Sequence, residues 1–485
     1  MAGVDDAQAI QAVVANFKAG DLAAARKDCE HFFSTVSDPA RQAPLRFWMG
    51  AIAQRSGALT AAVEQFEIAL LANHQDPMWL LQTGLAHFQL KAFERAEYLY
   101  RESLRLQPHY PLAHYNLGVL LQEKRDWGAA KRAFEAAITQ QPQFAEAHVN
   151  LGNTFVALAE FEPAGECYRR ALTFNSRLAN AHYGLGLHHV RSSQRALAKE
   201  SFATAVECDP AHLDAWLELA ECHHLSGDDA RAVTCVEQVL ARDVNHEIAR
   251  FKRAHFNGEQ PAITPPQLLT RLYASMANTF DEHLTERLGY RIPALLADEL
   301  RPWLSECKAR NGAWPGVLDL GCGTGLFGQA VREFASTLVG VDLSAPMLDK
   351  ARARKIYDEL IECDIHTFLR RDNHKADLIT ATDVLIYVGK LDALFALIPS
   401  HLNLAGIFAF STESPGDLAD DFRLESTGRY SHHPRYIDRL AVDNGLEIIK
   451  RIDTVIRNEM AVPLSGNVFI MRKNQGSTDL FPARE

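Results

Sequence analysis

A period of 34 residues runs through the first half of this 485-residue chain. Steps of 34 from Gly50 reach only small residues, a second series twelve residues further on contains only alanine, and a third, four residues later, is mostly aromatic. Such a period predicts stacked helical hairpins, because one hairpin cannot bury its apolar face alone. The three series are Gly50, Gly84, Gly118, Gly152, Gly186 and Ala220; Ala62, Ala96, Ala130, Ala164, Ala198 and Ala232; and Phe66, Tyr100, Phe134, Tyr168, Phe202 and Val236.

The first half resembles the tetratricopeptide repeat (TPR), whose Leu-Gly pair stands here as Leu117-Gly118, Leu151-Gly152 and Leu185-Gly186. We expect an all-α solenoid over residues 1–256, with six repeats at about 43–245, a diverged hairpin at 5–35 and a capping helix at 246–256. The resemblance implies a concave groove that binds a protein or peptide. Asn116 and Asn150, just before two Leu-Gly pairs, are candidate groove contacts or, alternatively, solvated helix residues.

Three histidines share the period of the repeats: His114, His148 and His182. Equivalent atoms on successive hairpins lie too far apart for one ion, whose bonds to histidine nitrogen measure about 2.0–2.1 Å. We therefore expect these histidines to serve packing or groove polarity, and we predict no metal site. The eight cysteines include no Cys-x-x-Cys pair, which is typical of a reduced protein.

Two Gly/Pro clusters at 257–266 predict a linker, after which the 34-residue period stops. The second half alternates short apolar runs with amphipathic ones, which predicts βαβ units and a doubly wound, mainly parallel α/β sheet over 267–475, with a tail at 476–485. The expected strands are Val317–Leu320, Leu338–Val341, Glu359–Ile361, Leu378–Ala381 and Ile407–Ser411, and a closing antiparallel edge is expected at Glu447–Val455 and Asn467–Met471. Helices are expected at Gly325–Phe334, Ala345–Arg354, His366–Arg371 and Leu391–Leu402.

A glycine loop follows the first expected strand, with Asp319, Gly321 and Gly323 in alternation. Two cofactors compete for it, because the loop fits both the dinucleotide fingerprint and the loop of S-adenosylmethionine (SAM) enzymes. Asp319 would repel a pyrophosphate but favours the ammonium and sulfonium of SAM. Asp342, which ends the second strand, suits the ribose of either cofactor.

Residues from about 266 to 473 resemble a class I SAM-dependent methyltransferase, and together with the repeats the chain resembles the bacterial TPR methyltransferases. The resemblance implies SAM-binding roles for Asp319, Gly321, Cys322, Gly323, Asp342, Leu343, Asp364, Ile365 and Asp383. It also places Tyr387, Tyr430 and His432 near the reacting methyl, with His432 as a candidate general base, and Tyr290 and Arg291 near the acceptor. The alternative is that His432 lies at the start of a helix and points outward.

Three functions follow from these features: a methyltransferase whose repeats deliver a protein, peptide or small-molecule acceptor; a non-catalytic TPR scaffold with a SAM-binding regulatory domain; and an NAD-linked oxidoreductase. The net charge of −11 argues against nucleic-acid binding. The chain opens on an acidic, Ala-rich stretch and has no apolar run of about 18 residues, so we expect a cytoplasmic protein that does not span a membrane.

Overall fold

The structure is a computed structural model that describes residues 2–276, 280–414, 416, 420–425, 427–459 and 462–474. The chain divides into two units, Met1–Leu219 and Ala220–Glu485, which are described separately. The division falls ahead of the linker expected at 257–266, so that linker stays a prediction as a domain boundary. The expected tail at 476–485 lies outside the described residues.

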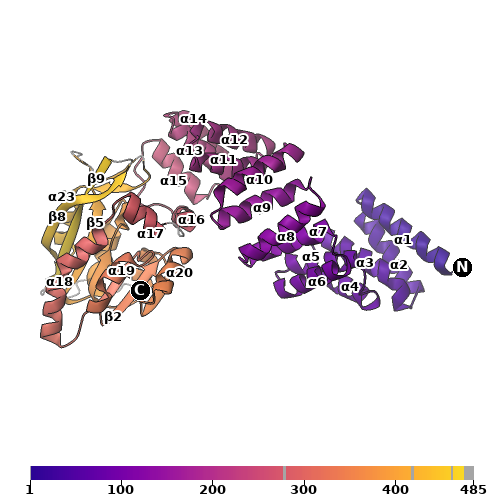
Figure 1. Ribbon diagram of the computed structural model, residues 1–485, viewed down its shortest axis with the longest axis horizontal. Helices are drawn as coiled ribbons and strands as arrows, with labels where there is room; N and C mark the ends of the chain where they lie inside the picture. The colour runs from indigo at the N-terminus through magenta and orange to yellow at the C-terminus, as the bar shows by residue number, and fades with distance from the viewer. Residues whose placement is uncertain are drawn as a thin grey trace. The chain divides into compact units, whose positions relative to one another are not determined.

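The first unit consists of helices joined into successive hairpins (Figure 1). The all-α solenoid predicted from the sequence is confirmed, and the helices of its last hairpin continue into the second unit. The extra hairpin is α1 (Ala2–Ala19) and α2 (Leu22–Thr35), and the first five repeats are α3 (Pro39–Arg55) with α4 (Leu59–Ala72), α5 (Pro77–Gln89) with α6 (Phe93–Leu106), α7 (Pro111–Glu123) with α8 (Trp127–Gln140), α9 (Ala145–Ala157) with α10 (Phe161–Phe174), and α11 (Ala179–Arg191) with α12 (Arg195–Cys208).

The repeated glycines are required by the repeated aromatic rings. A Cβ atom built on Gly118 would lie 2.6 Å from a ring carbon of Phe134, and the same clash recurs in the four other Gly/aromatic repeats at 2.5–2.7 Å. In the sixth repeat Ala220 and the smaller Val236 occupy these two positions, and both are fully buried. Each hairpin therefore closes only where the volumes at the two positions complement each other.

The repeated histidines each bind a main-chain carbonyl six residues earlier. The ring Nε2 of His148 donates to Pro142 O at 2.9 Å, which ties the start of α9 to the preceding turn. The same bond is made by His114 to Pro108 O, His182 to Ser176 O, Trp216 to Pro210 O and, through Nε, Arg250 to Val244 O. Within the described residues no group of three or more His, Cys, Asp or Glu side chains is arranged to hold a metal ion.

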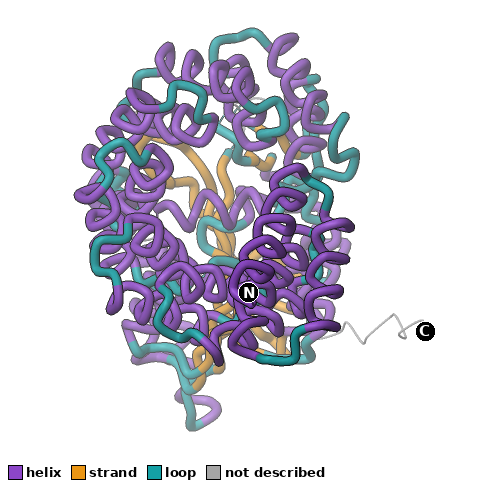
Figure 2. The backbone as a smooth tube through the Cα atoms, turned by 90° about the vertical axis from the view of Figure 1, so that its right-hand side faces the viewer, coloured by secondary structure: helices purple, strands orange, loops and turns teal. Residues whose placement is uncertain are grey.

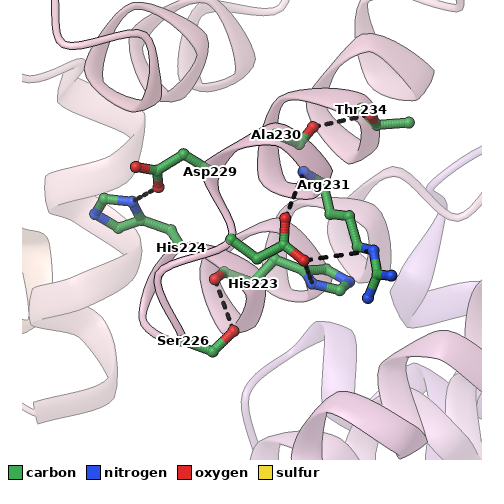
Figure 3. Close-up of polar contacts among 8 residues, drawn as sticks. His223, His224, Ser226, Asp229, Ala230, Arg231 and Thr234 are labelled. Atoms are coloured by element: carbon green, nitrogen blue, oxygen red, sulfur yellow. Dashed lines mark hydrogen bonds and ion pairs between the residues drawn. The ribbon is translucent and has the colours of Figure 1, made fainter.

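The second unit begins with the end of α13 (Leu213–His224), followed by α14 (Asp229–Leu240) and α15 (Glu247–Phe256). Figure 3 shows the turn between α13 and α14, where His224 Nδ1 lies 2.6 Å from Asp229 Oδ1 and Ser226 Oγ donates to His223 O at 2.8 Å. These histidines therefore stabilise the turn of the last hairpin. At the other end, Phe251 of α15 packs with Leu424 and Tyr430 of the α/β part.

All strands of the described chain lie in the second unit and form one nine-stranded sheet (Figure 2). The strand order is β3-β2-β1-β4-β5-β7-β6, and β9 pairs with β5 and β8. The strands are β1 (Gly316–Leu320), β2 (Thr337–Asp342), β3 (Glu359–Glu362), β4 (Ala376–Ala381), β5 (Leu402–Glu413), β6 (Phe422–Leu424), β7 (Tyr430–His432), β8 (Leu446–Glu459) and β9 (Val462–Lys473).

Both faces of the sheet are covered, as expected for a mainly parallel sheet. Along β1, Val317 and Leu318 point into different cores, one on the side of α18 and α19 and the other on the side of α21, α22 and α23. The helices are α16 (Pro266–Met276), α17 (Phe280–Glu282), the π-helix η1 (His283–Arg287), α18 (Ile292–Asn311), α19 (Leu326–Val331), η2 (Arg332–Phe334), α20 (Ala345–Arg354), α21 (Ile365–Arg371), η3 (Leu385–Tyr387), α22 (Asp392–His401) and α23 (Pro434–Asp443).

The predicted α/β class and doubly wound topology are confirmed. Strands β1 to β5 run parallel to their neighbours in the order 3-2-1-4-5, while β5, β9 and β8 pair antiparallel. Strands β1 to β3 follow one another toward one edge of the sheet, whereas β4 and β5 lie on the other side of β1. The order therefore reverses between β1 and β4, and sheets of this type bind ligands at such a position. None of the described helices has both the length and the apolarity needed to cross a membrane.

Replacing Gly118 with alanine should destabilise the solenoid by about 1–3 kcal/mol, because the new methyl group overlaps the ring of Phe134. Gly128→Ala is the matched control: its Cβ would come no closer than 3.8 Å to Arg132, so better helix propensity should leave stability unchanged or raise it by up to about 1 kcal/mol. Urea unfolding followed by circular dichroism measures both. Equal midpoints for the two variants would contradict the packing argument.

Candidate functional site

A cavity opens at the carboxyl ends of β1, β2, β3 and β4, on the edge of the sheet where the strand order reverses. It encloses about 1100 Å³, part of it open to solvent. Its walls come from the loops after these strands and from the segment that leads into the α/β part of the chain. The sheet topology and the cavity therefore agree on the position of the site.

The glycine loop after β1 is held against the end of β2 by one carboxylate. Asp342 accepts a hydrogen bond from Gly323 N and another from Ser344 N, both at 2.8 Å. Gly321 has φ +66° and a Cβ there would lie 2.2 Å from Val384, whereas a Cβ on Gly323 would meet nothing within 4 Å. Gly321 thus serves close packing, and Gly323 leaves backbone accessible beside the cavity.

Eight of the nine predicted cofactor residues line this one cavity: Gly321, Cys322, Gly323, Asp342, Leu343, Asp364, Ile365 and Asp383. Three of them are carboxylates from the ends of three different strands. Burial raises the pKa of Asp342, and Asp364 caps α21 by accepting from Thr367 N at 2.9 Å. The cavity therefore combines an acidic rim with an open glycine backbone.

Asp319, the ninth, does not line the cavity. It is fully buried, and it accepts hydrogen bonds from Tyr357 Oη at 2.7 Å and Thr380 Oγ1 at 3.0 Å. Burial raises its pKa to about 7. The sequence argument that Asp319 repels a pyrophosphate is therefore corrected, because its carboxyl group faces two hydroxyls inside the fold instead of the ligand space.

Asp383 is held in place by a buried arginine that the sequence did not reveal. Its backbone has φ +58°, its N–H donates to Ser411 Oγ at 3.0 Å, and Arg457 Nη1 lies 2.7 Å from its Oδ1. The side chain of Arg457 is 1% exposed and also pairs with Glu413, whose pKa burial raises to about 7. Arg457 comes from β8, far along the chain and outside any motif, so only the fold brings it here.

Of the predicted catalytic and acceptor residues, Tyr387 and Tyr290 line the cavity and Arg291 does not. Arg291 is exposed at the start of α18. The hydroxyl of Tyr387 accepts from Tyr273 Oη at 2.6 Å, and burial raises the pKa of both tyrosines. Tyr273, on α16, was missed because its segment carries no motif and reaches the site only through the fold.

His432 and Tyr430 do not reach the cavity, which corrects their predicted catalytic roles. Both are fully buried in β7. His432 Nε2 donates to Val388 O at 2.8 Å, and burial lowers its pKa to about 4. Tyr430 Oη donates to Pro261 O at 2.7 Å. The segment expected to meet the acceptor instead forms the β6–β7 hairpin behind the cavity wall.

The predicted groove residues Asn116 and Asn150 take equivalent positions on the first helices of two adjacent repeats. Both are half-exposed, and Asn150 Nδ2 donates to Tyr115 Oη at 3.0 Å. Their role in binding a peptide stays a prediction.

Comparison with protein families agrees with this geometry. A model described as "Methyltransferase domain" matches residues 317–406, and models described as "Tetratricopeptide repeat" match 49–111, 115–179 and 190–254. The chain is a tetratricopeptide-repeat protein fused to a methyltransferase domain. The methyltransferase match covers β1 to β4 and the start of β5, which supply the cavity's glycine loop and its three carboxylates.

Curated relatives are O-methyltransferases. The chain is 25% identical over 195 residues to malonyl-[acyl-carrier protein] O-methyltransferase of Hamiltonella defensa, covering 40% of this chain and 68% of the relative. It is 28% identical over 99 residues to ubiquinone biosynthesis O-methyltransferase of Coxiella burnetii, covering 20% and 42%. The crystal structure of YrrB, a TPR protein with an unusual peptide-binding site, matches with 22% identity and TM-score 0.33, covering 39% of this chain and 97% of YrrB.

Stability should depend on pH through Asp319. Because its pKa rises from 3.8 to about 7 on folding, the folded protein keeps a proton that the unfolded chain releases. The stabilisation from this proton is present below the unfolded pKa and is lost as the pH rises through about 7, by on the order of 1.4 kcal/mol per unit of pKa shift. The free energy of unfolding of wild type minus that of Asp319→Asn should therefore fall between pH 5 and 8.

Urea unfolding at pH 5, 6, 7 and 8 measures this difference, and the shared contribution of Glu413 cancels between the two proteins. Asp349→Asn, which replaces an exposed acid on α20, provides the control. A difference for Asp319→Asn that rises with pH would contradict the assignment.

Proposed function

We propose that this protein transfers a methyl group from SAM to an acceptor bound at the same cavity. The observation that carries the proposal is the convergence of Asp342, Asp364 and Asp383 on one cavity beside the open backbone of Gly323. SAM carries an ammonium and a sulfonium and no phosphate, so an acidic cavity favours it, whereas the pyrophosphate of NAD would meet three carboxylates.

Each of these residues fits a part of SAM. Asp342, at the end of β2, is placed to accept hydrogen bonds from ribose hydroxyls, and Asp364 with Ile365 offers a carboxylate and an apolar face to adenine. Asp383, fixed by Arg457, keeps a carboxylate near the cationic methionyl part. SAM supplies a methyl group already activated by its sulfonium, so the protein's task is to position two partners and exclude water.

The rest of the cavity lining suits an acceptor. Phe280, Leu284 and Val384 supply apolar surface, and Tyr273 and Tyr387 supply hydroxyl groups. Helix α17 is held against the glycine loop, because Asp281 accepts from Thr324 Oγ1 and pairs with Arg354. These groups orient an acceptor and limit water around the methyl group.

We propose an oxygen atom as the methyl acceptor, in line with the O-methyltransferase relatives, on a protein or peptide that the repeats bind or deliver. A small molecule is the alternative acceptor. A non-catalytic scaffold that only binds SAM is the second candidate function, and the absence of His432 and Tyr430 from the cavity lining favours it. A protein that binds SAM and transfers no methyl group would be such a scaffold and not a methyltransferase.

Asp342→Asn should weaken the binding of SAM and of S-adenosylhomocysteine by about tenfold or more. The carboxylate accepts hydrogen bonds from the ribose hydroxyls, and the neutral amide that replaces it accepts them more weakly. Isothermal titration calorimetry measures both affinities. Asp349→Asn, on the exposed face of α20, should bind like wild type. Wild type that binds neither compound would refute the SAM proposal.

Tyr387→Phe should reduce methyl transfer by about tenfold while leaving the affinity for SAM within about twofold, because it removes a hydroxyl beside the acceptor, with its hydrogen bonds to Tyr273 and Arg429, and leaves the carboxylates of the cavity unchanged. The assay incubates cell extract with isotopically labelled SAM and the full-length protein, and mass spectrometry identifies the labelled protein or metabolite. Unchanged labelling would remove Tyr387 from the acceptor site. Binding of SAM with no labelled product by wild type would support the scaffold.

A further inference from the structure

The segment Gln260–Pro266, expected to be a linker, is hydrogen-bonded to the α/β part like a short added strand. Ile263 pairs antiparallel with Val388. On either side of it, Ala262 O accepts from Gly389 N at 2.9 Å and Thr264 N donates to Tyr387 O at 3.0 Å. The segment therefore runs beside the residues that follow β4, one of which is the cavity residue Tyr387.

A second set of hydrogen bonds joins the same segment to the β6–β7 hairpin. Tyr430 Oη donates to Pro261 O at 2.7 Å, and Leu424 N donates to Gln260 Oε1 at 2.7 Å. Both donors belong to the β6–β7 hairpin, whose His432 also binds Val388 O. Hydrogen bonds thus join the segment, the residues around Val388 and the β6–β7 hairpin to one another, which fixes the position of all three.

This segment forms part of the cavity itself. Ile263, Thr264 and Pro266 line it, and α16 continues the same wall with Leu269, Thr270 and Tyr273. Among the described lining residues, none from this segment or from α16 carries a charge, whereas the carboxylates all come from the strand ends. The residues that this wall contributes to the cavity are therefore uncharged, although Arg429 hydrogen-bonds Tyr387 beside it, and the residues from the strand ends are acidic.

We infer that Gln260–Pro266 is a fixed wall of the acceptor site, and that this wall selects an uncharged, apolar group as the part of the acceptor that enters the cavity. The inference rests on the proposed function. It gives His432 and Tyr430 a positioning role, because Tyr430 bonds the wall at Pro261 and His432 bonds its partner Val388. It also predicts that a charged side chain at Ile263 excludes the acceptor without changing the cofactor end.

The probe is 2-naphthol, an uncharged aromatic molecule with one hydroxyl, titrated by fluorescence into full-length protein saturated with S-adenosylhomocysteine. Ile263→Glu should weaken its binding by about tenfold or more, because a carboxylate enters an apolar wall. The matched control is Ile449→Glu, since Ile449 on β8 is 46% exposed against 42% for Ile263 and lies outside the cavity lining. The control should bind 2-naphthol like wild type.

Calorimetry with S-adenosylhomocysteine is done first on each protein and should give affinities within about twofold of one another, because the cofactor end is unaltered. Failure of wild type to bind it would count against the proposed function. Two results would contradict the inference. One is wild type that binds S-adenosylhomocysteine but shows no saturable binding of 2-naphthol, and the other is an Ile263→Glu variant that binds 2-naphthol like wild type.

If Ile263→Glu fails to fold or to bind S-adenosylhomocysteine, Tyr430→Phe tests the inference about the wall instead. It keeps the buried ring and removes the hydroxyl that donates to Pro261 O. A loosened wall should weaken 2-naphthol binding by about threefold or more with the cofactor affinity retained, since one hydrogen bond is lost. Unchanged 2-naphthol binding in this variant would contradict a wall that depends on the hairpin.

Discussion

The carboxylate of Asp342 is the interaction on which the geometry of the cavity depends. It bonds the backbone of the loop after β1 and that of the loop after β2, two segments that meet only because their strands are parallel neighbours. Without it the N–H of Gly323 would lack this partner at the cavity rim. A single side chain thus shapes the loop, sets its own orientation, and places negative charge beside the ligand space.

Features encoded by local periodicity were predictable from the sequence. The repeat hairpins follow from small residues and rings at fixed spacing, and the parallel strands follow from apolar runs between amphipathic ones. Eight of nine predicted cofactor residues meet at one cavity because parallel strands end at a common edge. Such inferences need only the position of a residue along its own element.

Features that depend on which segments meet in space were not predictable. Asp319 sits in a motif, yet its side chain turns inward to Tyr357 and Thr380. Arg457 belongs to no motif and reaches Asp383 only through the antiparallel strands β8 and β9. The Gly/Pro composition of residues 257–266 predicts a linker, although their carbonyls and amides bond to residues 387–390, which follow β4 and come more than a hundred residues later.

The recurring bond to the carbonyl six residues earlier shows what the repeats hold constant. Histidine makes it three times, tryptophan once and arginine once. The shared property is a nitrogen-bound hydrogen at a fixed reach, not an amino-acid type. A profile scored by residue identity would rate this position as variable, while the contact itself persists. This position therefore requires a donor group and not one residue type, so that repeats with different side chains here keep the same turn geometry.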